Sequence, residues 1–263
     1  GDWNLLSRRD LYDIHNWRVF SPITRCLGTH LKEVQMNKEK ISIFDKNGLY
    51  QGSNERSLAY ALGQRVGLVF IWNVWKASDG TTEMLLQTRS RPNDPFAGNI
   101  DAPAGGHIRS NETPLEAAYR EWKEEVGISI TSDQLIPLGF IPVDDFFAKM
   151  HRKVTQFFFL NPTQSSLMGT VFSEEVQAFS IVEFKSFTDL VFNRVDSINA
   201  LNRSSEKHGS LVQKPIKREV LRTYTPSIID VIKRSMNSID HYFTTSIIDP
   251  SFWNYEKNRL AEN

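Results

Sequence analysis

Three glutamates close together in the sequence are the residues best suited to chemistry in this chain. Glu121, Glu124 and Glu125 have the i, i+3 and i+4 spacing that places side chains beside one another on a helix. At roughly 5–6 Å and an effective dielectric constant of 20, each pair of carboxylates repels by roughly 3 kcal/mol, and by much less in open water. Taken alone, the cluster fits a solvated acidic face that Arg120 and Lys123 partly neutralise.

The loop before these glutamates favours a different explanation, a metal site. Gly105 and Gly106 end an extended apolar segment, and a short loop then leads into the glutamate-bearing segment. Glycine has no Cβ, so backbone carbonyls can approach a cation closely there. Carboxylate and carbonyl oxygens are hard ligands that suit Mg²⁺ or Mn²⁺. The combination predicts a divalent-metal site formed by the loop and the helix.

The segment that carries the glutamates has the signals of a helix with defined ends. Thr113 can cap it, Pro114 suits the first helical position, Glu116 completes a capping box, and Gly127 is a natural stop. Apolar residues recur at helical spacing and predict a stripe that faces a core, with the glutamates on its flank. The stripe consists of Leu115, Ala118, Tyr119, Trp122 and Val126.

The order of these residues resembles the Nudix box along its whole length. The matching positions are Gly106, five residues, Glu112, seven residues, Arg120-Glu121, and then Trp122 through Glu124-Glu125 to Gly127-Ile128. One departure is Asn111, where family members often carry glycine, but asparagine tolerates left-handed backbone. The resemblance implies an α/β fold, the Nudix α/β/α sandwich with a mixed central sheet. It also implies a Mg²⁺-dependent hydrolase whose substrate is a nucleoside diphosphate linked to another moiety.

The same resemblance implies roles for the residues of the signature. Glu124 and Glu125, with the Gly105 carbonyl, would hold Mg²⁺ or Mn²⁺, and Glu121 would bind a further metal or orient water. These three glutamates are the expected catalytic set. The general base varies within the family, and Glu121, Glu174 and Glu175 are all candidates. Structural roles are implied for Gly106, Glu112, Arg120 and Gly127.

A second resemblance covers residues 41–128 and concerns the Nudix subgroup related to isopentenyl diphosphate isomerase. It rests on the segments FDKNGLYQGS, LLQTRS and AGGHI in that order. True isomerases place a catalytic cysteine just before the Gly-His pair, where this chain has Ala102, Pro103 and Ala104, and its single cysteine is Cys26. We therefore expect a hydrolase on an isomerase-like scaffold.

Three alternatives to that reading remain. One is an isomerase acting on a C5 diphosphate, which the missing cysteine disfavours. Another is a binding module without activity, which the complete carboxylate set disfavours. The third lies within the hydrolases, as an ADP-ribose or nucleotide-sugar hydrolase, because Pro142 stands about where some ADP-ribose hydrolases carry a proline.

The elements expected around the box define a domain at 40–236, an N-terminal extension at 1–39 and a tail at 237–263 that packs on the domain. A helix is expected over 8–19. Alternating and apolar runs predict a hairpin over 40–52 and strands at 65–75, 83–89, 135–143, 154–160 and 179–182. Short helices are expected at 187–190 and 227–236. The segments 144–147 and 197–214 are expected to be loops because they are polar or follow a strand end.

The net charge and composition of the chain limit the classes of binding partner that we expect. The formal net charge is zero, so no general affinity for nucleic acid or anionic membranes is expected. No apolar run approaches about 18 residues, and the N-terminus does not have the pattern of a signal peptide. A single cysteine fits a reducing compartment, and we expect a cytoplasmic protein with a small diphosphate substrate. The oligomeric state stays open, with a homodimer as one option.

Overall fold

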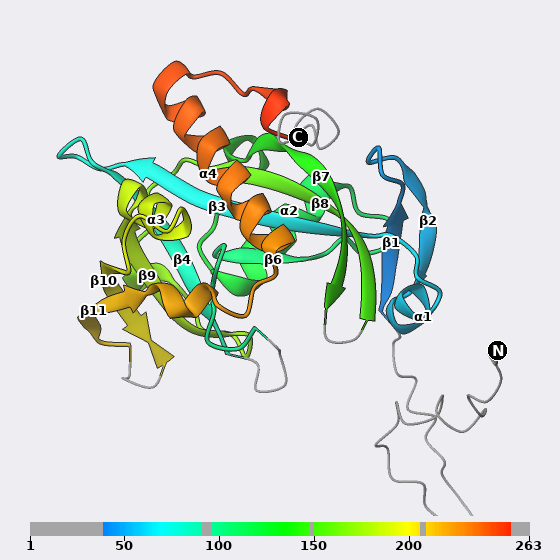
Figure 1. Cartoon of the computed structure of the whole chain (residues 1–263), viewed down its shortest axis with the longest axis horizontal. Coiled ribbons are helices and arrows are strands. Elements are labelled where there is room, and N and C mark those ends of the chain that lie inside the picture. The colour runs from blue at the N-terminus through cyan, green and yellow to red at the C-terminus, as the bar shows by residue number, and fades with distance from the viewer. Residues whose placement is uncertain (1–38, 91–95, 148–149, 206–208, 254–263) are drawn as a thin grey trace, which may run out of the picture. The chain divides into compact units, whose positions relative to one another are not determined.

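The computed structural model describes residues 39–90, 96–147, 150–205 and 209–253 (Figure 1). The strands are β1 Lys40–Phe44, β2 Tyr50–Glu55, β3 Val66–Lys76, β4 Thr82–Arg89, β5 Ile100–Asp101, β6 Ala104–His107, β7 Ile136–Phe147, β8 Met150–Asn161, β9 Val176–Glu183, β10 Ser197–Ser204 and β11 Leu211–Lys217. The helices are α1 Arg56–Ala61, α2 Pro114–Glu125, α3 Phe184–Val191 and α4 Pro226–Thr245, with short 3-10 turns at Ser132–Gln134, Leu167–Gly169, Arg218–Leu221 and Pro250–Trp253.

Strand β3 organises the sheet. It pairs antiparallel with β1, β4 and β6 and parallel with β8, so the sheet is mixed. The main strand order is β11-β10-β9-β4-β3-β1-β2, with β7 joined through β8. The nearly continuous apolar sequence of β3 is typical of a strand covered on both faces, and most of its residues are buried.

Helices cover both faces of this sheet. Alternate residues of β3 belong to two separate apolar cores, as the period of two in a strand requires. Val69, Ile71 and Trp75 pack with α2, whereas Trp72 and Val74 pack with α3 and α4. Figure 1 shows α3 and α4 lying across one face of the sheet. The expected α/β sandwich with a mixed central sheet is confirmed.

Helix α2 begins and ends as the sequence predicts. Thr113 and Glu116 form a complete capping box, and Pro114 is the first helical residue. The helix ends at Glu125, and Gly127 follows with a φ of +77°. The polypeptide leaves the helix there through a backbone conformation that favours glycine.

The predicted apolar stripe of α2 is only partly correct. Ala118, Trp122 and Val126 are buried, but Leu115 and Tyr119 are each 37% exposed. The buried face is rotated instead toward Ala117, Glu121 and Glu125. The cause is close packing against β6, because an added Cβ on Gly106 would lie 2.3 Å from the Oε1 atom of Glu121. Two of the three glutamates therefore lie in the interface rather than on its flank.

The expected hairpin over 40–52, the strands and the helix at 187–190 are all confirmed. Two expected loops are wrong. Residues 144–147 continue β7 and pair with β8, because the hairpin between these strands extends to Phe147. The segment 197–214 contains β10 and the first part of β11, which pair with each other. Its polar residues alternate with buried Ile198, Ala200 and Asn202, a pattern of half-buried strands that the overall polarity obscured.

The C-terminal helix is longer than the sequence suggested. Helix α4 continues past Met236 to Thr245, so the expected boundary at 236 falls inside it. The expected helix over 8–19 and the single cysteine, Cys26, lie outside the described residues, as does the end of the tail after residue 253. None of the helices in the described ranges has both the length and the apolar character needed to span a membrane.

Truncating the core tryptophan of α2 should destabilise the fold. Trp122 is fully buried, and its indole N–H donates to the Ile128 carbonyl at 2.8 Å. We expect Trp122→Ala to lower the free energy of unfolding by about 3–5 kcal/mol. The control is Tyr119→Ala on the exposed side of the same helix, which should cost about 1 kcal/mol or less. Urea unfolding measures both, and equal losses would show that the helix faces are assigned incorrectly.

Candidate active site

Arg120 is the centre of the polar network that joins α2 to the loop before it. Its guanidinium donates from Nε to Glu112 at 2.6 Å, from Nη1 to Glu121 at 2.7 Å and to Glu124 at 3.2 Å. Its Nη2 donates to the backbone carbonyl of His107 at 2.9 Å. Burial disfavours the charge on Arg120, but the carboxylates around it raise the pKa of Arg120 above its ordinary value. One cation therefore ties α2 to the loop that precedes it.

Glu112 holds that loop in place from the other side. Its Oε2 atom accepts from the backbone N–H of Arg109 at 3.0 Å and from Arg120 at 2.9 Å. Burial tends to raise the pKa of Glu112, but these hydrogen bonds outweigh it and lower the pKa. The preceding Asn111 has a φ of 73°, the left-handed conformation that the sequence predicts for this departure from glycine. The structural role expected for Glu112 stays a prediction, and this geometry suits it.

Glu125 is the most deeply buried carboxyl of the signature, at 6% exposed. Its Oε2 atom accepts from the backbone N–H of Gly105 at 3.2 Å and lies 3.4 Å from the Nε2 atom of Gln87 on β4. Burial raises the pKa of Glu125 to about 8, and the negative charge of Glu121 adds to this effect. A carboxyl that is costly to ionise when alone is well placed to receive a cation.

Glu121 lies beside Glu125 and is 9% exposed. Burial raises the pKa of Glu121, although the charge of Arg120 opposes the shift. Its carboxylate packs against Gly106, a position at which any side chain would collide with it. The glycine of the signature therefore allows a carboxylate to approach the strand backbone directly.

The donor set fits a divalent cation, although the side chains do not enclose one as they stand. Glu124, with a side chain 47% exposed, pairs with Arg120 and also with Arg109 at 3.4 Å. In the described part of the chain, no three His, Cys, Asp or Glu side chains converge on one point that could hold a metal. Two buried carboxyls nevertheless lie against the backbone of β6, Glu125 at Gly105 and Glu121 at Gly106. The buried Oε1 atom of Gln87 next to them has no hydrogen-bond partner among the described residues.

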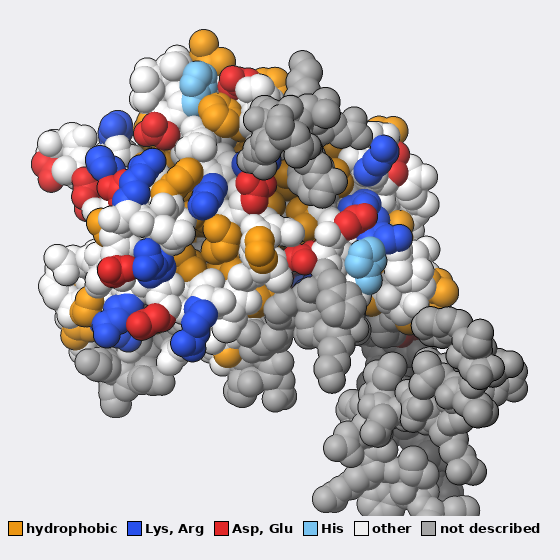
Figure 2. Space-filling model, in the orientation of Figure 1, with side chains coloured by type: hydrophobic (Ala, Val, Ile, Leu, Met, Phe, Trp, Pro, Cys, Tyr) orange, Lys and Arg blue, Asp and Glu red, His pale blue; other side chains and the backbone are white. Residues whose placement is uncertain are grey.

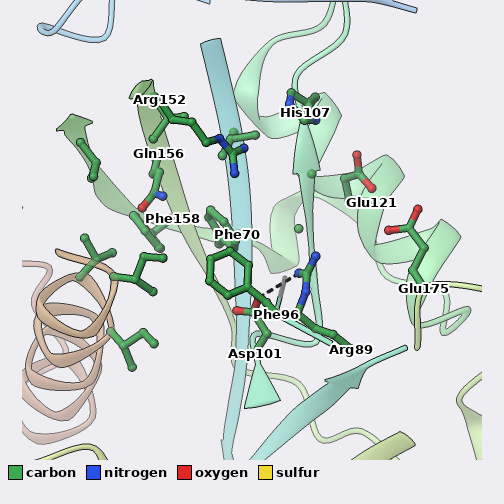
Figure 3. A pocket seen from close by; sticks show the side chains of 18 of the residues that line it. Phe70, Arg89, Phe96, Asp101, His107, Glu121, Arg152, Gln156, Phe158 and Glu175 are labelled. Carbon is green, nitrogen blue, oxygen red and sulfur yellow. Dashed lines mark hydrogen bonds and ion pairs between the residues drawn. The ribbon is translucent and has the colours of Figure 1, made fainter. Parts of the chain in front are cut away.

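A cavity of about 590 Å³ opens from these carboxylates across the sheet. Glu121, Glu124, Gly105 and Gly106 line one end of it. Figure 3 shows Glu121 and Glu175 on one side, with Arg152, Gln156 and Phe158 on the other. Of the two glutamates expected as alternative general bases, Glu175 lines the cavity, whereas Glu174 is exposed and does not.

A second polar cluster forms the rim of the cavity. The Tyr60 hydroxyl lies 2.7 Å from the Nε2 atom of His107, and Arg152 donates to the same hydroxyl at 3.0 Å. Because the hydroxyl accepts from Arg152, its own proton is free to be donated to the histidine nitrogen. The cluster positions Arg152 where its charge faces the cavity (Figure 3).

Sequence reasoning missed several residues of the cavity. Arg89 and Gln156 were assigned only to strands, and Arg152 was assigned to no element. Arg89 pairs with Asp101 at 3.1 Å on the cavity wall. A signal was present in β4 and β8, since polar residues at alternate positions of otherwise buried strands often point toward a site. This polar alternation cannot be interpreted from the sequence alone, because the sequence does not show which strands lie side by side.

Comparison with known proteins identifies the family. The profile of the NUDIX domain family matches residues 69–201, just over half of the chain. The chain belongs to the Nudix family. The expected membership of the Nudix family is confirmed, and with it the expected class of enzyme, a hydrolase.

Individual proteins are similar to parts of this chain. An uncharacterized Nudix hydrolase of Clostridium acetobutylicum is 25% identical over 166 residues, which cover 63% of this chain and 80% of the relative. An uncharacterized Nudix hydrolase of Yersinia pestis is 34% identical over 35% of this chain, and the match spans 48% of that protein. The crystal structure of a MutT/nudix family protein from Enterococcus faecalis is 15% identical, with a TM-score of 0.42 and coverage of 67% of this chain and 64% of that chain.

The raised pKa of Glu125 predicts a pH-dependent cost in the metal-free protein. The pKa is about 8 in the folded state, above the ordinary carboxyl value of 4.5. Between pH 4.5 and about pH 8, Glu125 is protonated in the folded state but ionised in the unfolded state. Its contribution to the free energy of unfolding therefore falls as the pH rises through that range. Glu125→Gln keeps the shape without the charge. The quantity to compare is the free energy of unfolding of Glu125→Gln minus that of the unmodified protein, both in EDTA. This difference should increase by about 2–4 kcal/mol between pH 5 and pH 8.5.

Thermal unfolding across that pH range measures the difference between the two proteins, so shifts from other titrating groups cancel. A difference that stays constant from pH 5 to pH 8.5 would show that Glu125 is not held in a desolvated environment.

Proposed function

We propose that this Nudix protein hydrolyses a diphosphate linkage in a nucleoside diphosphate derivative, with Mg²⁺ or Mn²⁺ bound at the box glutamates. The observation that carries the proposal is the burial of Glu121 and Glu125 one turn apart on α2, where Glu121 lines one end of the cavity and Glu125 accepts from the backbone N–H of Gly105. Two carboxyls in such a position repel when ionised, and a divalent cation removes that repulsion.

The chain would bind the cation through carboxylate and carbonyl oxygens. Glu124 and Glu125 with the Gly105 carbonyl would form one set, and Glu121 would hold a further ion or a water. When bound, the cation supplies charge neutralisation for the diphosphate and acidifies water. Arg120 keeps the glutamates in position, and Arg109 and Arg152 at the cavity bring positive charge to the phosphates.

Proton removal from the attacking water is assigned to Glu175. Glu121 already accepts a hydrogen bond from Arg120 at 2.7 Å and is reserved for a metal ion or a water, and Glu174 is exposed and does not line the cavity. Glu175 lines the cavity from the segment before β9, opposite the sheet wall with Gln156 (Figure 3). A carboxylate there can accept a proton from water near the diphosphate.

The isomerase alternative remains disfavoured. Ala102 and Ala104 are buried, and with Pro103 they offer no ionisable group where an isomerase places its cysteine. The ADP-ribose alternative gains nothing from Pro142, which lies within β7 opposite Thr155.

A panel of nucleoside diphosphate derivatives in ¹⁸O water tests the reaction type. Label in a phosphate product and loss of turnover in EDTA are expected. Isomerised isopentenyl diphosphate without hydrolysis of any nucleotide would contradict the proposal.

A matched pair of variants tests the general base. Glu175→Gln should reduce kcat by about 10²–10⁴-fold, because it removes proton transfer from the attacking water. Glu174→Gln, one residue away and exposed, should stay within about twofold of the unmodified enzyme. Steady-state kinetics on a substrate found in the panel measures both. Similar effects of the two substitutions would exclude Glu175 as the base and return the role to Glu121.

A further inference from the structure

A buried glutamine of β4 faces α2, on the side of the sheet that carries the box helix. Gln87 is 4% exposed, although its side-chain amide is strongly polar. It is two residues from Leu85, so both side chains lie on the same face of β4, and Leu85 belongs to the core that packs with α2. Its neighbour across the sheet is the fully buried Phe179. Gln87 is therefore a polar group in an apolar interface.

The surface of the protein shows why this placement is unusual. On the face drawn in Figure 2, Lys, Arg, Asp and Glu side chains are spread over the surface, where water solvates them. A polar side chain inside the interface between a sheet and a helix loses that solvation, and this costs free energy unless its atoms find hydrogen-bond partners. The partners of Gln87 therefore indicate why the residue is there.

The amide of Gln87 is only half satisfied. Its Nε2 atom lies 3.4 Å from the Oε2 atom of Glu125, which is longer than the usual N–H···O distance. Its Oε1 atom is buried and has no hydrogen-bond partner within the described ranges. A buried acceptor without a partner costs stability, so an apolar side chain of the same size would suit the fold at least as well. Stability of the fold does not explain the amide.

Other buried amides of the described ranges hold parts of the fold together. Asn73 donates to two backbone carbonyls at the end of β8 and just after it, at 2.9 and 2.8 Å. Asn202 donates to the hydroxyl of Ser180 at 2.9 Å and so joins β10 to β9. The amide of Gln87 differs from these, because the one group it contacts is the carboxylate of Glu125 in the candidate site.

The two carboxylate oxygens of Glu125 have different surroundings. Oε2 accepts from the backbone N–H of Gly105 at 3.2 Å and is also the atom that Gln87 contacts. Oε1 accepts no hydrogen bond from any residue of the described ranges. Two donors, one on β6 and one on β4, therefore hold the same oxygen and fix the rotation of the carboxylate. The other oxygen is left for a ligand.

We propose that Gln87 is a positioning residue for the cation. Its side-chain N–H and the backbone N–H of Gly105 hold Oε2 of Glu125, so Oε1 is the oxygen presented to the metal ion. Residues that orient a metal-binding carboxylate through hydrogen bonds have a large effect on metal affinity. Gln87 lies on β4, outside the signature. The inference rests on the proposed function, because that function places the cation at Glu125.

The unpaired acceptor of Gln87 fits the same role. A protein-bound Mg²⁺ ion usually keeps several waters, and these waters are hydrogen-bond donors. The Oε1 atom of Gln87 can accept from such a water, because it is buried on an amide that contacts Glu125 and has no other partner among the described residues. An aliphatic side chain would supply neither this acceptor nor the N–H donor.

Binding of Mn²⁺ alone to the full chain tests the inference without relying on turnover. Electron paramagnetic resonance of free Mn²⁺ gives the dissociation constants of the unmodified protein, Gln87→Met and Gln87→Leu. Both substitutions replace the amide by an aliphatic side chain of similar size, and both should weaken Mn²⁺ binding about 10–100-fold. The Tm of each variant in EDTA should rise or stay within about 2 °C of the unmodified protein, because the amide contributes little to the fold.

The matched control is Asn202→Leu, which removes a buried amide that joins two strands. Its Tm in EDTA should fall by about 2–4 °C or more, with the Mn²⁺ dissociation constant within about twofold of the unmodified protein. Mn²⁺ affinity within about twofold in both Gln87 variants would overturn the inference. A fall in Tm as large as that of Asn202→Leu in both variants would also overturn it, because Gln87 would then be a structural amide.

Glu125→Gln separates failure of this inference from failure of the proposed function. Suppose that Glu125→Gln weakens Mn²⁺ binding strongly, whereas both Gln87 variants bind as the unmodified protein does. Gln87 is then not a positioning residue, and the proposed metal site stands. If Glu125→Gln instead binds Mn²⁺ as tightly as the unmodified protein, the cation lies elsewhere and the proposed function fails together with the inference.

Discussion

The site depends on a single guanidinium that holds acidic groups which would otherwise repel. Arg120 binds Glu112 on the loop, Glu121 and Glu124 on α2, and the carbonyl of His107 at the end of β6. Without it, the loop would be tied to these helix side chains mainly by the Arg109–Glu124 pair at 3.4 Å, and the carboxylates would repel one another. An arginine suits this position because its planar group offers five donors in fixed directions. The network explains how a cluster of acids can persist before any cation is bound.

The same arrangement requires α2 to bury acidic side chains in its packing interface. Most helices bury apolar residues, yet this one buries Glu121 and Glu125 and exposes Leu115 and Tyr119. Close contact with Gly106 is what permits the arrangement. The free energy lost by burying these carboxyls must be offset by Trp122 and the neighbouring core. The burial of these two carboxyls therefore lowers the stability that α2 contributes to the fold.

Much of this architecture could be predicted from sequence. Capping residues and Gly127 fixed the ends of α2, and the long apolar run identified β3. The β10–β11 hairpin was not predictable in the same way, because its burial depends on Asn202 bonding to Ser180 of a neighbouring strand. The rotation of α2 and the choice of Glu175 over Glu174 depend on three-dimensional packing. The signature predicted a cluster of acids on α2, whereas only the fold brings Gln156 and α4 to the same cavity.

The most direct test of the account is to locate the cation itself. Crystals of the protein soaked with Mn²⁺ and measured near the manganese absorption edge give an anomalous map that is independent of activity. A peak is expected in contact with the carboxylate of Glu125 and close to the Gly105 carbonyl, with Glu121 or Glu124 adjacent. Saturating Mn²⁺ with no peak at these carboxylates, or with a peak held only by residues outside the signature, would contradict it.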